Sequence, residues 1–219
     1  MNTELIKEDL RWCIRRLPKD VVAMLKENPN KVFISGGYIR SCVSGEKVND
    51  IDIFAESKEK AELLARRLTD KYHRLIETDN AFTVLGYKYT IQIIHRWTFD
   101  SPEQCIQSFD FTIAKSAIWS DGKEYKSLID ERFYVDLAAK RLTYCNPCRN
   151  EDAGGSILRM FKFYQRGYRS PLTSIAGVIA RLVQKLEDKG EWTEENNTKI
   201  ICGLLREVDP DIDPEHIAH

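Results

Sequence analysis

The chain has 219 residues, of which 42% are hydrophobic and 31% are charged, with a formal net charge of −1. This length suffices for one well-packed core and a small second one. The near-neutral charge excludes a broadly basic nucleic-acid-binding protein, because such a surface needs a large excess of Lys and Arg. The chain opens without a signal-peptide core and has no apolar run of membrane-spanning length, so we expect a cytoplasmic protein with reduced thiols and no membrane partner.

The first part of the chain alternates helical and extended patterns. Apolar residues at helical spacing predict an amphipathic helix over residues 3–17 and a short helix over 20–27. Apolar runs predict strands at 31–35 and 48–55. A glycine pair and a short helical turn separate these two strands.

The middle of the chain predicts a helix followed by hairpins. Ser57 is a suitable N-cap for a helix that extends to about residue 72. Residues 74–85 and 87–97 are expected to pair as a hairpin turned near Gly86. The remaining expected elements are a short helix begun by a capping box at Ser101 and a hairpin of residues 111–119 and 124–129.

After Asn146-Pro147 the pattern becomes helical. Helices are expected over residues 156–166, 171–188 and 193–208, followed by an acidic tail with prolines. We therefore predict a head domain over residues 1–150 and a small all-helical domain over 151–219.

Asp50 and Asp52 are the first candidates for chemistry. On a strand they point to the same face, whereas the intervening Ile51 points into the core. Two neighbouring carboxylates repel each other unless a divalent cation neutralises them. Mg²⁺ prefers such hard oxygen ligands together with water and substrate phosphates, so we predict an Mg²⁺ site, with Mn²⁺ as a substitute.

The segment Ser35-Gly36-Gly37 is the second candidate. Glycines at the start of a helix let backbone N–H groups approach phosphate oxygens, and the helix dipole favours negative charge there. Arg40 follows one turn later and can contact a phosphate or a carboxylate of the site. We expect these four residues to bind a nucleotide.

In this order, the glycine pair, the arginine, Gly45 and the Asp-x-Asp strand resemble the head domain of the polymerase-β-type nucleotidyltransferase superfamily. Within it, they are most similar to the branch of bacterial poly(A) polymerases and CCA-adding enzymes. The resemblance covers about Lys31 to Gly167. It implies an α+β fold, in which a mixed sheet flanked by helices is followed by a small all-helical appendage.

Later segments resemble the same branch. Residues 109–113 are similar to its Arg-Arg-Asp-Phe-Thr motif, whose Asp, here Asp110, contacts the sugar or supports the metal site. Asp136 lies in a segment similar to its Asp-Leu element. The helix at 157–163 resembles the family's basic helix, which implies that Arg159 and Lys162 hold the triphosphate.

The chain also departs from the family pattern. Ser108 and Phe109 occupy the places of the paired arginines, and Gln92 stands where a third carboxylate often lies. Either Asp110 completes the metal shell, which we favour, or only the two strand aspartates bind metal. No Glu-Asp-x-x-Arg element follows the basic helix, so the choice of base does not carry over.

These features predict a poly(A) polymerase-like nucleotidyltransferase. It would move a nucleoside monophosphate from a triphosphate, with ATP or CTP preferred, to an acceptor hydroxyl and release pyrophosphate. The resemblance implies an RNA or tRNA 3′ end as the acceptor. Only about 65 residues follow the head, fewer than a tRNA-gripping body needs, so we expect a minimal RNA-modifying enzyme in which homo-oligomerisation supplies further surface.

Two alternatives remain open at this stage. Gln92 and the missing arginines also suit a catalytically silent nucleotide-binding protein of the same fold. A transferase of the toxin or antibiotic-modifying type would instead label a protein or small-molecule hydroxyl. Labelling with radioactive triphosphates, followed by RNase treatment, distinguishes the three hypotheses.

Overall fold

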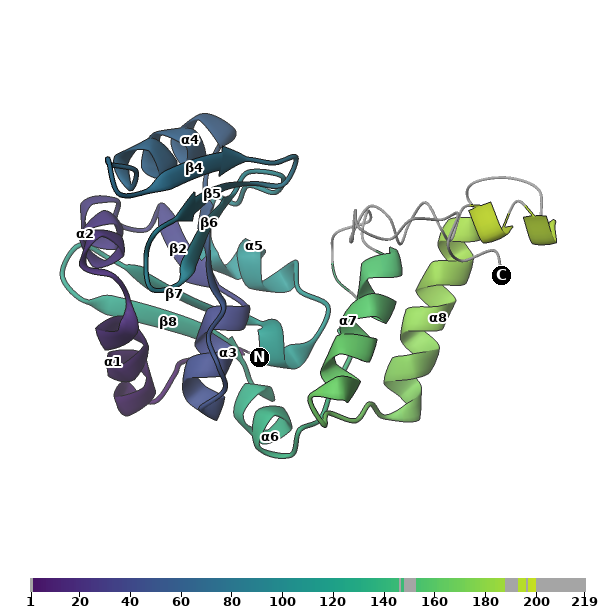
Figure 1. Cartoon of the computed structure of the whole chain (residues 1–219). Helices are drawn as coiled ribbons and strands as arrows, with labels where there is room; N and C mark the ends of the chain where they lie inside the picture. Colours follow the sequence, from purple (N-terminus) through teal and green to yellow (C-terminus); the bar gives the residue numbers. More distant parts are fainter. Residues whose placement is uncertain (1, 146, 148–152, 188–192, 196, 200–219) are drawn as a thin grey trace. The chain divides into compact units, whose positions relative to one another are not determined.

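The computed structural model describes residues 2–145, 147, 153–187, 193–195 and 197–199 (Figure 1). The chain forms two compact units, Met1–Ala138 and Ala139–His219. The first unit contains a mixed sheet with flanking helices, and the second contains a pair of helices. This arrangement confirms the predicted α+β fold class.

A sheet of eight strands lies at the centre of the described part of the first unit, in the order β1-β8-β7-β2-β3-β6-β5-β4. The pair β3–β6 is parallel, and every other neighbouring pair is antiparallel. The strands are β1 (Asn2–Thr3), β2 (Val32–Ser35), β3 (Asp50–Ala55), β4 (Arg74–Glu77), β5 (Ala81–Leu85), β6 (Thr90–Ile94), β7 (Ser116–Ser120) and β8 (Tyr125–Asp130).

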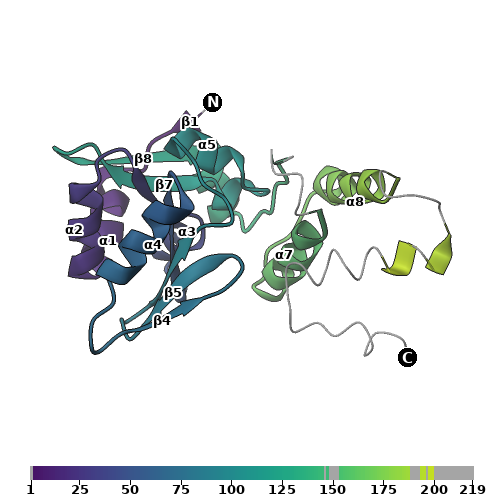
Figure 2. The same cartoon turned by 90° about the horizontal axis from the view of Figure 1, so that it is seen from above.

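Helices cover the sheet of the first unit. Figures 1 and 2 show α1 and α2 next to each other, and α5 beside β7 and β8. Ser57 caps α4 by accepting the Lys60 N–H at 3.1 Å, as its sequence position predicts. The helical segments are α1 (Lys7–Arg16), α2 (Lys19–Glu27), α3 (Gly37–Ser44), α4 (Lys58–Arg67), α5 (Pro102–Gln107), the 3₁₀ turn η1 (Thr112–Ala114) and α6 (Phe133–Ala138).

The two faces of β3 have different surroundings. Ile51 and Ile53 are fully buried on the face where α4 packs against β3, β5 and β6. Because side chains alternate along a strand, Asp50, Asp52 and Phe54 point to the opposite face. The α4 face therefore holds one part of the core, and the other face combines the two carboxylates with a buried cluster of Phe33, Phe54 and Cys105 of α5.

Helix α3 is fixed to α1 by a buried contact. The Tyr38 hydroxyl donates to the Cys13 carbonyl at 2.6 Å, and both residues are almost fully buried. Cys42, on the same side of α3, is also buried. The four described cysteines, Cys13, Cys42, Cys105 and Cys145, are free thiols. This contact sets the direction of α3 and hence the position of its N-terminus.

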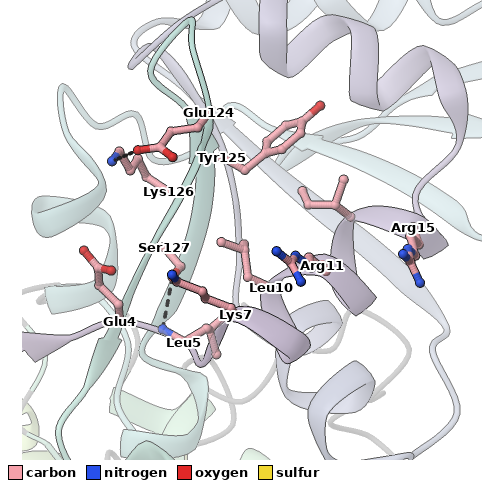
Figure 3. A pocket seen from close by; sticks show the side chains of 11 residues that line it. Glu4, Leu5, Lys7, Leu10, Arg11, Arg15, Glu124, Tyr125, Lys126 and Ser127 are labelled. Carbon is pink, nitrogen blue, oxygen red and sulfur yellow. Dashed lines mark hydrogen bonds and ion pairs between the residues drawn. The ribbon is translucent and has the colours of Figure 1, made fainter.

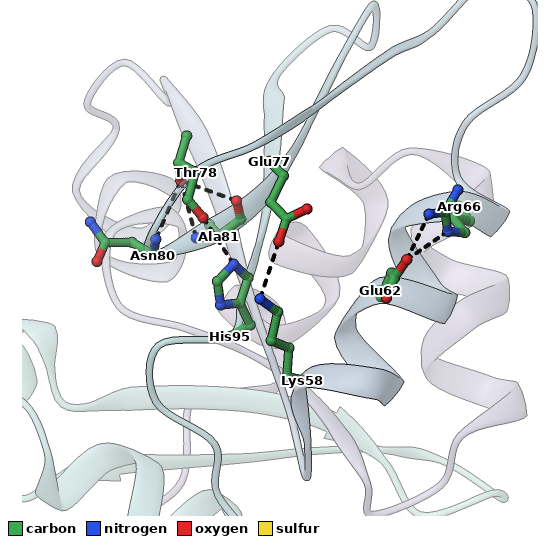
Figure 4. Close-up of polar contacts among 8 residues, drawn as sticks. All are labelled: Lys58, Glu62, Arg66, Glu77, Thr78, Asn80, Ala81 and His95. Carbon is green, nitrogen blue, oxygen red and sulfur yellow. Dashed lines mark hydrogen bonds and ion pairs between the residues drawn. The ribbon is translucent and has the colours of Figure 1, made fainter.

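The region between α4 and β6 differs from the prediction. The segment 74–85, expected to be one strand, folds into the antiparallel pair β4 and β5. Thr78 makes the turn, because its hydroxyl exchanges hydrogen bonds with both backbone groups of Ala81, and His95 contacts its carbonyl at 3.0 Å (Figure 4). This turn contains no glycine, so the sequence gives no signal for it like the one that Gly86 provides for the next turn.

Two further elements were not predicted. Asn2 and Thr3, expected in the first helix, form the short strand β1 against β8. The segment around Asp136 forms the helix α6, where the sequence indicates only a family motif. Both elements depend on contacts with residues far away in the sequence, so local periodicity does not reveal them.

The second unit is built around α7 (Ala153–Gln165) and α8 (Leu172–Glu187), which pack against each other. Gly167 ends the α7 region with a φ of 85°, as expected for a C-terminal glycine. Leu142 N–H donates to the Arg169 carbonyl, so residues after Ala138 already belong to this unit. The structural boundary thus precedes the predicted boundary after residue 150.

The predicted helix over 193–208 is helical at Glu194, Glu195 and residues 197–199, and the remainder, with the acidic tail, lies outside the described residues. None of the helices in the described part of the chain combines the length and apolar character that crossing a bilayer requires.

Candidate active site

Asp50 and Asp52 lie at the start of β3, both half-buried. Their neighbours on the parallel strand β6 are Thr90 and Gln92, respectively, which share the same face of the sheet. Gln92 is in turn paired with Thr83 of β5. A polar, partly exposed row therefore extends from Asp52 across three strands, on the face opposite α4.

The electrostatics of this pair are unfavourable without a counter-charge. Burial, together with the negative charge of Asp50, raises the pKa of Asp52 from 3.8 to about 7, while the Arg40 guanidinium acts in the opposite direction. At neutral pH the pair therefore carries a proton for part of the time. A divalent cation would replace that proton and remove the repulsion.

Gly37 brings the helix start next to the acidic pair. A Cβ atom placed on Gly37 would lie 3.7 Å from Arg40 Nη2 and 4.0 Å from Asp50 Oδ1. Arg40 is only 8% exposed, and its Nε lies 3.9 Å from Glu46 Oε2. The glycine, the arginine and the first aspartate thus meet in one small region, as the sequence predicts. Glu46 is a neighbour that the sequence did not indicate.

The two glycines have different roles. Gly36 has φ 77° and ψ −126°, and its N–H donates to the Ser116 carbonyl at 3.1 Å. The Gly36 amide thus has a partner in the sheet. Gly37 is the first residue of α3, where backbone N–H groups have no acceptor within the helix. Its amide is the one suited to a phosphate.

Ser35 is fully buried, and its hydroxyl donates to the same Ser116 carbonyl. It joins the end of β2 to β7, next to the pairing of Ser35 with Ala117. This placement favours a structural role for Ser35 over the expected nucleotide contact. The serine instead fixes the strand end from which the glycine turn departs.

Phe109 lies at the site, although its role was not predicted. A Cβ atom on Gly36 would lie only 3.1 Å from Phe109 Cε1, and the Phe109 ring meets Phe54 edge-on with centroids 6.2 Å apart. The ring thus packs between the glycine turn and β3. Only its position in place of a family arginine marked it in the sequence. Its apolar ring gives this edge of the site a different chemistry from the resembled enzymes.

Asp110 is 4% exposed, just beyond Phe109. In the described part of the chain, no group of three or more His, Cys, Asp or Glu side chains is placed to hold one metal ion. A shell of three carboxylates including Asp110 is therefore not assembled in this structure. The alternative, in which Asp50 and Asp52 alone contact a metal, agrees better with this geometry.

Asp136 explains how the segment after Asp110 is held. Its buried carboxylate accepts the Thr112 hydroxyl at 2.7 Å and the Arg132 guanidinium at 3.1 and 3.3 Å. Thr112 belongs to the predicted motif, so α6 anchors that motif through these bonds. Asp136 therefore acts indirectly, by holding the segment that carries Asp110.

Arg159 and Lys162 lie on α7 in the second unit. Arg159 is half-buried and Lys162 is exposed. A contact of these residues with a nucleotide at Asp50 stays a prediction.

Solved nucleotidyltransferases share this architecture. The Thermotoga maritima CCA-adding enzyme complexed with tRNA matches 98% of this chain and 52% of its own, with 22% identity and a TM-score of 0.57. A CCA-adding enzyme solved with ATP matches with a TM-score of 0.61 and 22% identity, and one solved with CTP with a TM-score of 0.60 and 20% identity. Each match includes 98% of this chain and 51% of the solved enzyme. The chain thus has the fold of this class of nucleotidyltransferases and spans about half of their length.

Residues 4–140 match the Gad2 family, the Gabija anti-defense 2 family proteins, and the chain belongs to this family. The protein Gabija anti-defense 2 of Bacillus phage SPbetaL7 is 29% identical over 102 residues, which represent 46% of this chain and 25% of that protein. The matched range includes the glycine pair, both strand aspartates and Asp110, and ends before α7.

Proposed function

We propose that this protein is a metal-dependent nucleotidyltransferase. It moves a nucleoside monophosphate from a nucleoside triphosphate to an acceptor hydroxyl and releases pyrophosphate. The observation that supports this most is the meeting of Gly37, Arg40 and Asp50 at a helix start, with Asp52 on the same strand face. The family name suggests that this activity serves to counter a defence system.

The residues fit a divalent cation. Asp50 and Asp52 offer hard oxygen ligands, and the raised pKa of Asp52 indicates that the pair lacks a positive partner strong enough to keep both carboxylates charged. These two residues would hold Mg²⁺ or Mn²⁺. When bound, the metal supplies charge neutralisation at the α-phosphate and at the leaving pyrophosphate.

The side chains and backbone of this chain would position the substrate. The Gly37 N–H, at the positive end of the α3 dipole, would donate to a phosphate oxygen. Arg40 would balance triphosphate charge, and Arg159 and Lys162 would do so from α7. Asp110 would orient the sugar. In-line attack by the acceptor oxygen on the α-phosphorus then breaks the bond to the pyrophosphate oxygen.

We propose ATP or CTP as the nucleotide and an RNA 3′ end, as in a tRNA or a poly(A) tail, as the acceptor. The fold is that of CCA-adding enzymes whose structures contain ATP, CTP or tRNA. The resembled branch also contains poly(A) polymerases. A homo-oligomer would extend the acceptor surface beyond that of the single chain.

The test incubates the protein with each of the four α-labelled triphosphates, Mg²⁺ and total RNA. We expect labelled RNA from the wild type, and a loss of at least about a hundredfold in the Asp50→Asn and Asp52→Asn variants, because several kcal/mol of charge stabilisation are removed. Asp79→Asn is the matched control, since Asp79 is exposed in the turn between β4 and β5, beside the end of the sheet strands opposite to Asp50. Equal labelling by all four proteins would refute the proposed site.

Two observations favour a second candidate, a silent nucleotide-binding protein. Gln92 lies in register with Asp52, where a third carboxylate is usual, and Phe109 packs on Gly36 in place of an arginine. This candidate predicts no labelling with any triphosphate, together with a rise in melting temperature when nucleotide is added. Label that survives RNase but not protease would instead identify a protein hydroxyl as the acceptor.

A further inference from the structure

A groove with a volume of about 650 Å³ lies between α1 and β8, outside the candidate active site. At one end of the groove, the Leu5 N–H donates to Ser127 Oγ at 3.0 Å (Figure 3). Beyond this hydrogen bond, α1 and β8 diverge. The residues that line it come from three segments: Glu4 and Leu5; Lys7, Leu10, Arg11, Ile14 and Arg15 of α1; and Glu124, Tyr125, Lys126 and Ser127.

The groove meets β8 along its edge. Four successive residues, 124–127, line the groove. Side chains of a strand alternate between its two faces, so a groove that touches successive residues must lie along the edge of the strand. The outer neighbour of β8 is β1, which pairs only with Ile129 and Asp130. Among the described residues, the edge of β8 before Ile129 thus has no strand partner. An open edge offers N–H and C=O groups to an extended peptide.

One wall of the groove is a row of cations. Lys7, Arg11 and Arg15 recur every four residues on α1, so they lie on one side of the helix, about 6 Å apart along its axis. All three are exposed, and none forms an ion pair or side-chain hydrogen bond with another described residue. Lys126, on the opposite wall, is already paired with Glu124 and Asp121. The α1 row therefore remains available for an anionic partner.

The floor combines apolar groups with one unsatisfied donor. Leu10 and Ile14 are half-buried between the cations. The Tyr125 hydroxyl is inaccessible to solvent and has no hydrogen-bond partner in the described part of the chain, while Lys26 Nζ lies 5.9 Å from the ring centroid. This hydroxyl is covered by the protein, so the floor offers a ligand apolar contacts from Leu10 and Ile14.

We propose that this groove binds an extended acidic segment of a partner protein, which adds a strand to β8 and places its carboxylates against Lys7, Arg11 and Arg15. A peptide matches the open backbone edge and the apolar floor. A nucleic acid would use the cation row but neither the open backbone edge nor the apolar floor.

The groove is independent of the candidate active site. On β7, Ser120 pairs with Tyr125 and Ile118 pairs with Ser127. Ile118 in turn pairs with Ile34 of β2. Ile34 pairs with Ile53, which points away from the face of Asp50 and Asp52. The floor of the groove thus lies on the opposite face of the sheet. Substitutions in the groove should leave nucleotide binding and transfer unchanged.

The test uses the full chain and a fluorescein-labelled peptide in which Glu alternates with Val, followed by fluorescence anisotropy. We expect this peptide to bind, and the same peptide with Lys in place of Glu to bind at least about tenfold more weakly. Single-stranded poly(U) is the competing probe. If poly(U) binds more tightly than the acidic peptide and depends on the same three cations, the groove is a nucleic-acid site and the proposal is wrong.

The triple variant Lys7→Glu, Arg11→Glu, Arg15→Glu should weaken binding of the acidic peptide at least about tenfold, because three exposed charge contacts become repulsive. The control Lys60→Glu, Lys71→Glu, Lys88→Glu makes the same change in net charge outside the groove and should bind the peptide as the wild type does. If both variants lost peptide binding equally, the loss would be an effect of net charge rather than of the groove, and the proposal would be wrong.

Strand addition has its own readout. Hydrogen exchange should slow at Tyr125 and Ser127, whose backbone N–H groups face the open edge, when the peptide binds. An acidic peptide N-methylated at alternate residues should bind at least about tenfold more weakly. The N-methylated peptide keeps its charge, so equal binding of both peptides would refute pairing with β8.

Discussion

Replacement of Asp52 by asparagine is expected to stabilise the metal-free protein above neutral pH. The folded-state pKa of Asp52 is raised from 3.8 to about 7. A carboxyl group with a raised folded-state pKa contributes stability that is fully present below pH 3.8 and is lost as the pH rises through about 7. The wild type must therefore carry a disfavoured charge at pH 8, which asparagine lacks.

The magnitude follows from the two pKa values. Each pKa unit corresponds to about 1.4 kcal/mol, so the change from 3.8 to about 7 sets an upper bound of about 4 kcal/mol. Asp52 is only half-buried and solvent screens part of the interaction, so we expect a gain of about 1–3 kcal/mol at pH 8. For a protein of this size, this gain raises the melting temperature by about 3–10 °C.

The assay is thermal unfolding followed by circular dichroism, in EDTA at pH 4, 6 and 8 and in Mg²⁺ at pH 8. Asp52→Asn should match the wild type at pH 4, exceed it at pH 8 and lose most of the Mg²⁺ response that we expect from the wild type. Asp79→Asn, at an exposed position, should follow the wild type throughout. The reasoning would be refuted if Asp52→Asn did not raise the melting temperature at pH 8, or if it raised it equally at pH 4 and pH 8.

Three further substitutions test neighbouring features. Gly36→Ala should lower the free energy of unfolding by about 1–3 kcal/mol, because an L residue is strained at φ 77° and its Cβ meets the Phe109 ring; an unchanged urea midpoint would contradict this. Asp136→Ala should cost about 1–3 kcal/mol in the same urea titration, since it leaves the buried Thr112 hydroxyl without its acceptor, whereas the Arg132 guanidinium remains half-exposed. Arg40→Gln should raise the pKa of Asp52 further and move the onset of Mg²⁺ stabilisation to higher pH, whereas a shift to lower pH would be inconsistent with its position.

The sequence was most informative where chemistry and local structure coincide. The alternation of Asp50, Ile51 and Asp52 placed two carboxylates on one strand face, and the structure has that strand. The glycine pair predicted a helix start, and α3 begins at Gly37. These features depend on neighbouring residues only, so they can be predicted from a single sequence.

The sequence was less informative where distant contacts decide the role of a residue. Ser35 and Gly36 are adjacent to the predicted site, yet both donate to Ser116, which is about eighty positions later in the chain. Such a bond follows from the pairing of β2 with β7, which no local pattern specifies. The same limitation explains why Asp136 was recognised as a motif but not as the partner of Thr112.

Phe109 links these two kinds of information. The family resemblance predicts a basic residue at this position, and the structure instead packs an aromatic ring against Gly36 and Phe54. Phe109 carries no charge, so the cation that acts on Asp52 is Arg40, which opposes the rise in the Asp52 pKa that burial and Asp50 cause. If transfer occurs, Arg40 then provides a larger share of the positive charge that the first unit directs at the phosphates. Loss of Arg40 should therefore impair this protein more than loss of one arginine impairs an enzyme that keeps the complete basic set.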